Sequence, residues 1–375
     1  MQVTSAVRRR KDGEKTAAVF IDYACAFDSV DHGCIVRELL SFGVEKHLVA
    51  WIAGFLKWRT ARVRVNGAPP EDKRLTCGVP HGSVLGQLPF IVTADSLSKR
   101  HNCIPGLQHG FFADDPTVVR TSADRSAIQQ TIQKGLDCIT NWSAEYYMEV
   151  SAEKTEYTLF GARETNLLSL KVGETVLKEE HTPRPLGLTM QPHKGLSKHV
   201  MRMNAAANTR LMQLRAMASP EWGPEREKLR AFYFALVQAK MCCGVASWWL
   251  GTSLSDRERF ERVQAQAAHI VAGIPKAANR KDALRKARLK PANEVPHRRA
   301  LEYYLRLKAK GPAHAKVADS IFPPERPIHV RLAKVQHLYS TIDSPEKPHD
   351  ATVLCWLGVS TSTSPRGSSR VDLQA

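Results

Sequence analysis

Short apolar runs that end at acidic residues mark the first part of the chain. Residues 16–21 form a nearly continuous apolar run that ends at Asp22, a pattern typical of a central strand buried on both faces. Residues 110–119 predict a strand, an acidic turn at Asp114 and Asp115, and a second strand. The pattern therefore places carboxylates at strand ends rather than on exposed helical faces.

Helical spacing fills the intervals between these strands. Residues 35–42 and 48–56 carry apolar side chains at helical spacing, and residues 126–142 predict a further helix. The alternating residues 60–65 run into Asn66-Gly67, a strong hairpin signal. A glycine-rich turn at 78–83 opens onto an apolar stretch that we expect to be helical as far as Leu97. The first part of the chain thus predicts an α+β fold.

The pattern changes from about residue 195 onward. Residues 198–310 are rich in Ala, Leu, Arg and Lys and poor in strand formers, which predicts helices. Between 276 and 316, 13 Lys and Arg residues stand against only three acidic ones. Beyond about residue 357 the serine- and threonine-rich sequence lacks any period and is expected to be disordered.

Charge narrows the class of partner. The 375 residues contain 54 Lys and Arg against 37 Asp and Glu, a formal net charge of +17, which favours an acidic partner such as nucleic acid. No apolar run approaches the ~18 residues of a membrane span, and the basic start has no apolar stretch behind it, so we expect an intracellular protein without a membrane partner. The eight cysteines form no C-x-x-C pair, which argues against a zinc cluster.

Asp22, Asp114 and Asp115 are the candidate catalytic residues. Magnesium prefers oxygen ligands and takes a few carboxylates together with substrate phosphates, so three Asp brought together from strand ends suit a two-metal site. The alternative is structural, because Asp is common at strand ends and in tight turns, where its side chain bonds nearby backbone amides. The neighbouring residues weigh against that alternative.

Three sequence motifs follow one another along the chain: FIDYACAFDSVDH at 20–32, GVPHGSVLG at 78–86 and FADD at 112–115. In that order and spacing the chain resembles the reverse transcriptase of a non-LTR (LINE-type) retrotransposon, most similar to the ingi-type elements of trypanosomes. Residues 152–161 resemble the family's fourth motif, and 186–189 its primer-grip motif. The resemblance covers about residues 8–350.

The resemblance implies roles for residues around the three Asp. It makes Asp22, Asp114 and Asp115 ligands of two Mg²⁺ ions, with Mn²⁺ as an alternative metal and the Tyr23 carbonyl completing one shell. It places the Phe27 ring beneath the incoming sugar, where the ring favours deoxynucleotides; that disfavours a third hypothesis, an RNA-dependent RNA polymerase. Alternatively, Phe27 is an ordinary core aromatic.

Further roles follow from the later motifs. His81 and Gly82 would contact the nucleotide, and glycine permits close approach of the backbone to the nascent base pair. Lys154 would protonate pyrophosphate, although a lone Lys is usually a solvated surface residue. Leu186 and Gly187 would form the primer grip.

The basic cluster would hold the nucleic-acid duplex by its phosphates, with steep salt dependence. The alternative is a solvated helical face. The residues expected to bind are Arg285, Lys286, Arg288, Lys290, Arg298 and Arg299.

Three features depart from the family. His81 stands where the family has Gln, Pro89 falls inside the helix of the second motif, and Pro116 follows Asp115 in the expected return strand. A proline inside a regular helix costs ~3 kcal/mol. Only 21 residues precede Asp22, so the basic fingers region and an upstream endonuclease are expected to be missing.

The fold predicted is an α+β, right-hand polymerase palm with an antiparallel sheet and packed helices, followed by a helical thumb, with the fingers mostly missing. The palm is assigned to residues 1–195, the thumb and basic region to 196–320, and an extended tail to 321–375. The leading hypothesis is an RNA-directed DNA polymerase impaired by truncation, with an RNA template, a DNA primer and deoxynucleoside triphosphates, located in the nucleus. The alternative is a non-catalytic nucleic-acid-binding remnant.

Overall fold

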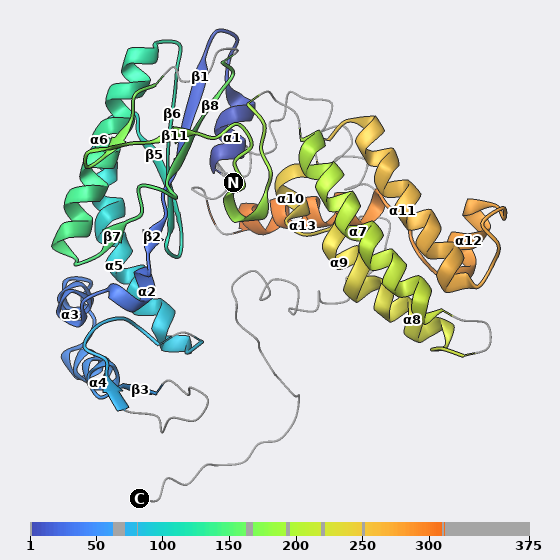
Figure 1. Cartoon of the computed structure of the whole chain (residues 1–375), viewed down its shortest axis with the longest axis horizontal. Coiled ribbons are helices and arrows are strands. Elements are labelled where there is room, and N and C mark those ends of the chain that lie inside the picture. The colour runs from blue at the N-terminus through green and yellow to red at the C-terminus, as the bar shows by residue number, and fades with distance from the viewer. Residues whose placement is uncertain are drawn as a thin grey trace, which may run out of the picture. The chain divides into compact units, whose positions relative to one another are not determined.

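A five-stranded sheet organises the first half of the chain (Figure 1). The computed structural model describes residues 2–62, 72–80, 82–162, 168–192, 196–218, 222–249, 252–309 and 311. These residues all fall in the first of two units, residues 1–335; the second comprises residues 336–375. The predictions for His81 and for the tail after residue 320 therefore lie outside the described residues.

The sheet has the strand order β11-β8-β1-β6-β5. Its strands are β1 (Lys15–Phe20), β5 (Gln108–Phe112), β6 (Asp115–Ser122), β8 (Glu156–Phe160) and β11 (Lys178–Glu179). All neighbours pair antiparallel except β11, which pairs parallel with β8. The prediction of a purely antiparallel sheet is therefore wrong at this edge: after the hairpin of β9 (Lys171–Val172) and β10 (Thr175–Val176) the chain returns in the direction of β8.

The central strand β1 is buried on both faces, as its apolar run predicted. Ala17 and Val19 pack into one core with α5 (Val84–Asn102) and α6 (Arg125–Glu145), and Figure 1 shows α6 along that side of the sheet. Ala18 points into a second, smaller core with Val3, Ala6 and Val7 of α1 (Gln2–Arg9). Alternate residues of one strand thus anchor helices on opposite faces.

Shorter elements surround the ends of the sheet. The predicted helices at 35–42 and 48–56 are confirmed as α3 (His32–Ser41) and α4 (Lys46–Lys57). The predicted hairpin is confirmed by the pairing of β3 (Thr60–Arg62) with β4 (Asp72–Arg74), although its turn lies outside the described residues. The remaining elements here are α2 (Ala26–Ser29), η1 (Pro185–Gly187), and the paired strands β2 (Tyr23–Ala24) and β7 (Glu149–Val150).

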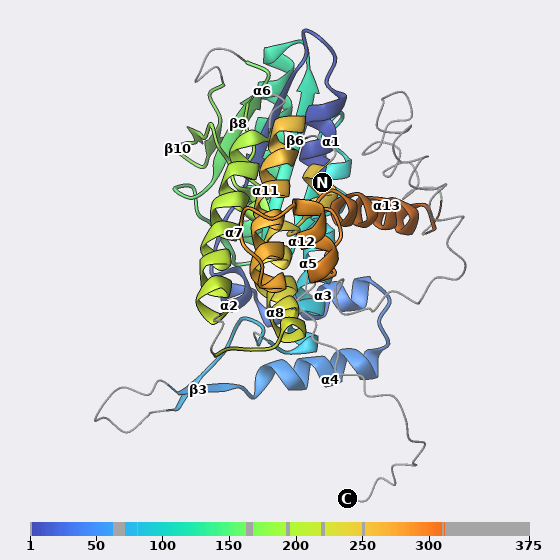
Figure 2. The ribbon, with the colours of Figure 1, turned by 90° about the vertical axis from the view of Figure 1, so that its right-hand side faces the viewer.

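The second half of the described chain is helical, as predicted. Its core holds Tyr233, Trp248, Trp249 and Phe260, all at most 1 % exposed. Figure 2 shows two of its long helices, α7 and α11, side by side, and they pack against each other. The elements are α7 (Ser197–Met217), α8 (Arg226–Phe232), the π-helical η2 (Tyr233–Gln238), α9 (Ala239–Met241), α10 (Val245–Trp248), α11 (Leu254–Ala272), α12 (Arg280–Ala287) and α13 (Glu294–Ala309).

One helical segment, Arg226–Trp248, is long and apolar enough to cross a membrane by length and composition, with a mean hydropathy of 1.2. The sequence reading, which found no apolar run of that length, missed this segment. Of the most apolar 18-residue window in this segment 33% is buried. The buried side chains of the segment, among them Leu229, Tyr233, Val237 and Trp248, belong to the helical core.

Candidate active site

Asp22 lies two residues after the end of β1, and its backbone is held on both sides. The Ile21 N–H donates to the Pro116 carbonyl at 3.0 Å, which ties the strand end to β6. The Asp22 N–H donates to Thr155 Oγ1 at 3.2 Å, and its carbonyl accepts from the Ser151 N–H at 2.8 Å. These bonds fix where the Asp22 carboxylate leaves the sheet.

Asp114 and Asp115 lie at the turn that joins β5 to β6. Phe112 pairs with Asp115, so Ala113 and Asp114 are the two turn residues. Ala113 has a φ of +52°, because two-residue hairpins require a positive φ in the turn. That conformation costs a non-glycine residue ~1–2 kcal/mol. Since β6 pairs with β1 beside this turn, the hairpin end lies next to Asp22.

Two of the three carboxylates act electrostatically on the third, Asp115. The Asp115 side chain has solvent-exposed surface, yet enough protein surrounds it to raise its pKa above the ordinary value, first by partial desolvation. The negative charges of Asp114 and Asp22 raise this pKa further. The structure therefore places the three predicted Asp at the same end of the sheet.

Oxygen donors with mutually repelling negative charge are the chemistry that a hard divalent cation prefers. Among the residues that the structure describes, however, no three His, Cys, Asp or Glu side chains are grouped so that they could hold a metal ion. The donor types of Asp22, Asp114 and Asp115 thus fit such an ion, while their side chains would have to converge further to share one. The fourth predicted ligand residue, Tyr23, is buried in β2, and burial raises the pKa of its hydroxyl to about 12.

The segment after Asp22 interlocks with the glycine-rich turn. The Val79 N–H donates to the Phe27 carbonyl at 2.6 Å, and the Gly78 N–H donates to the Val30 carbonyl at 2.8 Å. The Phe27 ring is half-buried and lies 4.6 Å from the Phe90 ring of α5, between ring centroids. Phe27 is therefore positioned by packing from one side while part of its surface remains open.

The two prolines that depart from the family pattern are both accommodated. Pro89 is the sixth residue of α5, which continues from Val84 to Asn102 without a break in its assignment. The Pro89 carbonyl accepts from the Thr93 hydroxyl at 2.9 Å. Pro116 is buried as the second residue of β6, where its carbonyl still accepts from Ile21.

Gly82 and Lys154 lie in turns that meet this region. Gly82 has a φ of +78°, is exposed, and precedes the Ser83 cap of α5. Lys154 is exposed in the turn between β7 and β8, and its neighbour Thr155 binds the Asp22 amide. Within the described residues, Lys154 forms no ion pair with Asp22, Asp114 or Asp115. The roles assigned to Lys154 and Gly82 therefore stay predictions.

The predicted primer-grip residues form an exposed turn with unusual backbone. Leu186 and Gly187 have φ values of +50° and +79°. Two residues later, the Thr189 N–H donates to His199 Nδ1 at 3.2 Å, and Arg202 donates to the Thr189 hydroxyl at 2.9 Å. The turn is thus tied to the first turns of α7.

The six predicted nucleic-acid-binding cations lie on or between α12 and α13. Most face acidic partners: Arg285 with Asp282 at 2.9 Å, Lys290 with Glu294 at 2.7 Å, and two others with Glu227 and Glu302 at 3.5 Å. Such exposed pairs contribute only ~0–1 kcal/mol each, so a phosphate can compete with them. Arg299 is half-buried and approaches the Cys242 carbonyl at 3.5 Å.

Sequence reasoning missed two residues that position the site. Thr155 binds Asp22 across 133 residues of chain, which no local pattern reveals. A Cβ added at Gly78 would lie 2.5 Å from the Asp28 carbonyl oxygen, so only glycine fits there. The glycine-rich motif that contains Gly78 was a usable signal, although the resemblance drew attention to Gly82 instead.

The comparisons with known proteins agree with this arrangement. Residues 2–217 match the family described as "Reverse transcriptase (RNA-dependent DNA polymerase)", and the chain belongs to that family. It carries a reverse transcriptase domain of the non-LTR retrotransposon type.

Two curated relatives come from Drosophila melanogaster. The chain is 25% identical over 224 residues to the RNA-directed DNA polymerase from mobile element jockey, which is 58% of this chain and 24% of that protein. It is 23% identical over 346 residues to a probable RNA-directed DNA polymerase from transposon BS, 89% of this chain and 37% of that protein. The chain therefore spans between about a quarter and two fifths of the length of these relatives.

Solved structures of telomerases are distant neighbours. Apo telomerase from Candida tropicalis superimposes with a TM-score of 0.41 at 11% identity, covering 85% of this chain and 55% of the telomerase. Telomerase from Candida albicans with a fragment of telomeric RNA gives a TM-score of 0.34 at 8% identity, covering 86% and 54%.

Proposed function

We propose that this chain catalyses RNA-directed DNA synthesis at the sheet end that carries Asp22, Asp114 and Asp115. The observation that carries the proposal is the pairing of β6 with β1, which sets the turn with Asp114 and Asp115 beside the strand end that leads to Asp22. The charges of Asp114 and Asp22 also help to raise the pKa of Asp115. A carboxylate with a perturbed pKa at an exposed strand end is the sort of group that a catalytic site uses. Family membership supplies the reaction class, nucleotidyl transfer to a primer hydroxyl.

The three Asp would hold two divalent ions, Mg²⁺ or Mn²⁺, which supply charge neutralisation for the triphosphate and the primer hydroxyl. The protein's own residues do the positioning. Thr155 and the β6 pairing keep Asp22 at the strand end, while the Phe27 ring, backed by Phe90, would lie under the sugar and exclude a 2′-hydroxyl.

Other residues complete the proposed assignment. His81 and Gly82 would contact the nucleotide, Lys154 would donate a proton to pyrophosphate, and Leu186 with Gly187 would hold the primer end. The finer resemblance to trypanosomatid ingi-type elements and a nuclear location belong to the same proposal.

The basic cluster is proposed to hold the template–primer duplex by its phosphates. Its cations are exposed or half-buried, and the acids that pair with them bind weakly enough to exchange. Neutralising Arg285, Lys286, Arg288 and Lys290 together should weaken duplex binding and reduce its salt dependence, measured as the slope of log affinity against log salt. An unchanged slope would leave the cluster as a solvated helical surface.

Primer extension tests the catalytic assignment. The full chain is incubated with an RNA template, an annealed DNA primer, deoxynucleotides and Mg²⁺. Asp115→Asn should lower the extension rate by about 10²–10³-fold, the loss that removal of one electrostatically stabilising group from an active site typically causes. Asp12→Asn is the matched control, because Asp12 is exposed and precedes β1.

Equal rates for the two variants would contradict the assignment of Asp115. A natural chain that binds the duplex yet extends no primer would favour the second candidate, a non-catalytic nucleic-acid-binding protein. The exposed basic helices, which need no catalysis to bind phosphates, are the observation that favours that candidate.

A further inference from the structure

Two side chains without a role in the proposed reaction meet at one backbone carbonyl. The His32 ring donates from Nε2 to the Gly78 carbonyl oxygen at 2.8 Å. The Arg59 guanidinium donates to the same oxygen and also to the Cys77 carbonyl, at 2.9 Å. Gly78 is buried, so its carbonyl needs a protein partner, and its two lone pairs can accept from both side chains.

Both donors are held in place by the helices from which they come. His32 is the first residue of α3, where the Asp31 side chain caps the helix by accepting from the Cys34 N–H at 2.9 Å. Arg59 lies between α4 and β3, and its Nε donates to the Leu56 carbonyl of α4 at 3.3 Å. The two side chains therefore reach the same carbonyl from two different helices, 46 and 19 residues away in sequence.

Residues 77–79 use their donors to bind the segment that carries Phe27. These bonds run to the carbonyl oxygens of Phe27, Asp28 and Val30 from the Val79 N–H (2.6 Å), the Cys77 thiol (3.3 Å) and the Gly78 N–H (2.8 Å). Residues 77–79 also lead into α5, whose Phe90 ring lies 4.6 Å from the Phe27 ring between centroids. The position of residues 77–79 therefore affects both the backbone and the ring of Phe27.

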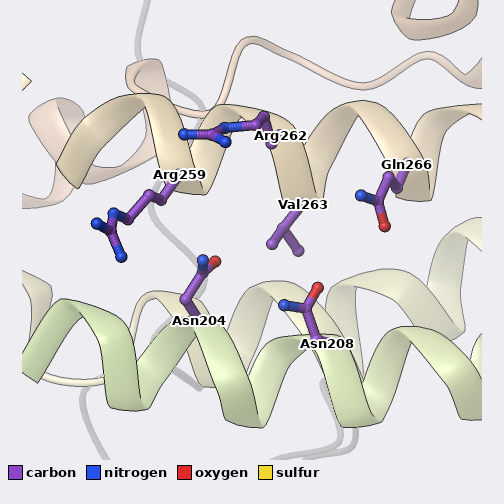
Figure 3. A pocket seen from close by; sticks show the side chains of 6 residues that line it. All are labelled: Asn204, Asn208, Arg259, Arg262, Val263 and Gln266. Carbon is purple, nitrogen blue, oxygen red and sulfur yellow. The ribbon is translucent and has the colours of Figure 1, made fainter. Parts of the chain in front are cut away.

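Arg59 differs in its partners from the arginines of the helical half. Figure 3 shows Arg259 and Arg262 beside a cavity of about 400 Å³ between α7 and α11, and Arg259 lies 3.9 Å from the Asp256 carboxylate. A guanidinium has five N–H donors and can bind several carbonyls at once. The donors of Arg59 bind the backbone carbonyls of Leu56, Cys77 and Gly78. Arg59 thus joins separate segments of the chain.

We propose that His32 and Arg59 are positioning residues that set where the Phe27 ring meets the sugar of the incoming nucleotide. Their bonds to the carbonyls of Cys77 and Gly78, named here the carbonyl clamp, hold residues 77–79 against the Phe27 segment. The proposal rests on the proposed function, in which Phe27 excludes a 2′-hydroxyl. Without the carbonyl clamp the ring can yield to that hydroxyl, so the choice between deoxynucleotides and ribonucleotides is relaxed.

Hydrogen exchange tests the carbonyl clamp without any synthesis. Exchange of the backbone amides of residues 77–79 is measured in the full chain. Arg59→Ala should speed this exchange about tenfold, or ~1.4 kcal/mol, which is close to the contribution of one hydrogen bond to a charged group. Arg62→Ala is the matched control, because Arg62 is exposed on β3 and donates to Asp72 at 2.9 Å.

Addition of single nucleotides to a primer tests the link to the sugar. Selectivity is the ratio of kcat/KM for a deoxynucleotide to kcat/KM for the matching ribonucleotide. Arg59→Ala and His32→Leu should each lower this ratio about tenfold, mainly by improving use of the ribonucleotide. His32→Gln keeps an N–H that can donate to the Gly78 carbonyl and should retain most of the selectivity, which distinguishes the hydrogen bond from simple filling of space. Thermal unfolding of each variant checks that it is folded.

Exchange that is no faster in Arg59→Ala than in Arg62→Ala would overturn the carbonyl clamp. Faster exchange with an unchanged selectivity ratio would overturn its role in the choice of sugar. Failure of the proposed function is a different observation, a natural chain that extends no primer. That result would overturn the role in sugar choice as well, while the exchange measurement still decides whether the carbonyl clamp holds residues 77–79.

Discussion

Replacing Gly78 by Ala should destabilise the fold far more than its chemistry suggests. Gly78 is buried with a φ of +76°, a conformation that costs an alanine ~1–2 kcal/mol. The new Cβ would also lie 2.5 Å from the carbonyl oxygen and 2.7 Å from the Cα of Asp28. These neighbours are backbone atoms, so no side-chain rotation relieves the clash.

The surrounding hydrogen bonds resist a backbone shift. The Gly78 N–H binds Val30, its carbonyl accepts from His32 and Arg59, and the next residue binds Phe27. Overpacking of a tight site typically costs ~1–3 kcal/mol. The two contributions sum to about 2–5 kcal/mol, or about 4–20 °C at ~2–4 °C per kcal/mol.

Gly82→Ala is the matched control, because Gly82 has nearly the same φ, +78°, with no atom within 4 Å of the added Cβ. It should lose only the conformational part, about 1–2 kcal/mol. Thermal and urea unfolding of both variants measures the difference. Equal losses would refute the reasoning, since they would show that the contact of Gly78 with Asp28 does not hold the loop in place.

Three further outcomes are expected. Burial lowers the pKa of His101 to about 4 and that of His109 below its usual range. The contribution of these two neutral side chains to stability is therefore complete above about pH 6.5, and the free energy of unfolding should fall as the pH drops toward 4. A free energy of unfolding that stays constant over this pH range would contradict the prediction. Pro89→Leu restores a helix amide donor and should raise the unfolding temperature, because the free energy of unfolding should increase by about 1–3 kcal/mol. Thr155→Val removes the hydroxyl that accepts from the Asp22 amide and should cost about 1 kcal/mol by urea unfolding. Thr140→Val makes the same change at a half-buried threonine whose hydroxyl donates to the Leu136 carbonyl of its own helix, and serves as the comparison.

Local pattern was sufficient for strands β1, β5 and β6 and for helices α3, α4, α5 and α6. The apolar run before Asp22 predicts a strand buried on both faces, because apolar side chains occupy both faces of the strand. Ala17 and Ala18 indeed enter different cores. The hairpin with Asp114 in its turn was equally predictable from the sequence. These features depend on residues that are adjacent in sequence.

Features that depend on distant residues were not predictable. The first helix, α1, hides its buried Val3, Ala6 and Val7 within a basic segment that resembles a solvated arm. Its apolar positions at i, i+3 and i+4 become informative only once the sheet provides a face to cover. The parallel pairing of β11 depends in the same way on where the preceding hairpin turns the chain.

The carboxylates lie at the end of the sheet, outside its buried interior. Within β1, Ala17 and Val19 are fully buried and paired on both sides, so the strand cannot move to relieve repulsion at its end. Asp22 lies just beyond the buried strand β1 and is itself only half-buried, and Asp115 is the first residue of the neighbouring strand β6 at the same end of the sheet. The like charges that raise the pKa of Asp115 are therefore tolerated because the core, and not the site, supplies the stability.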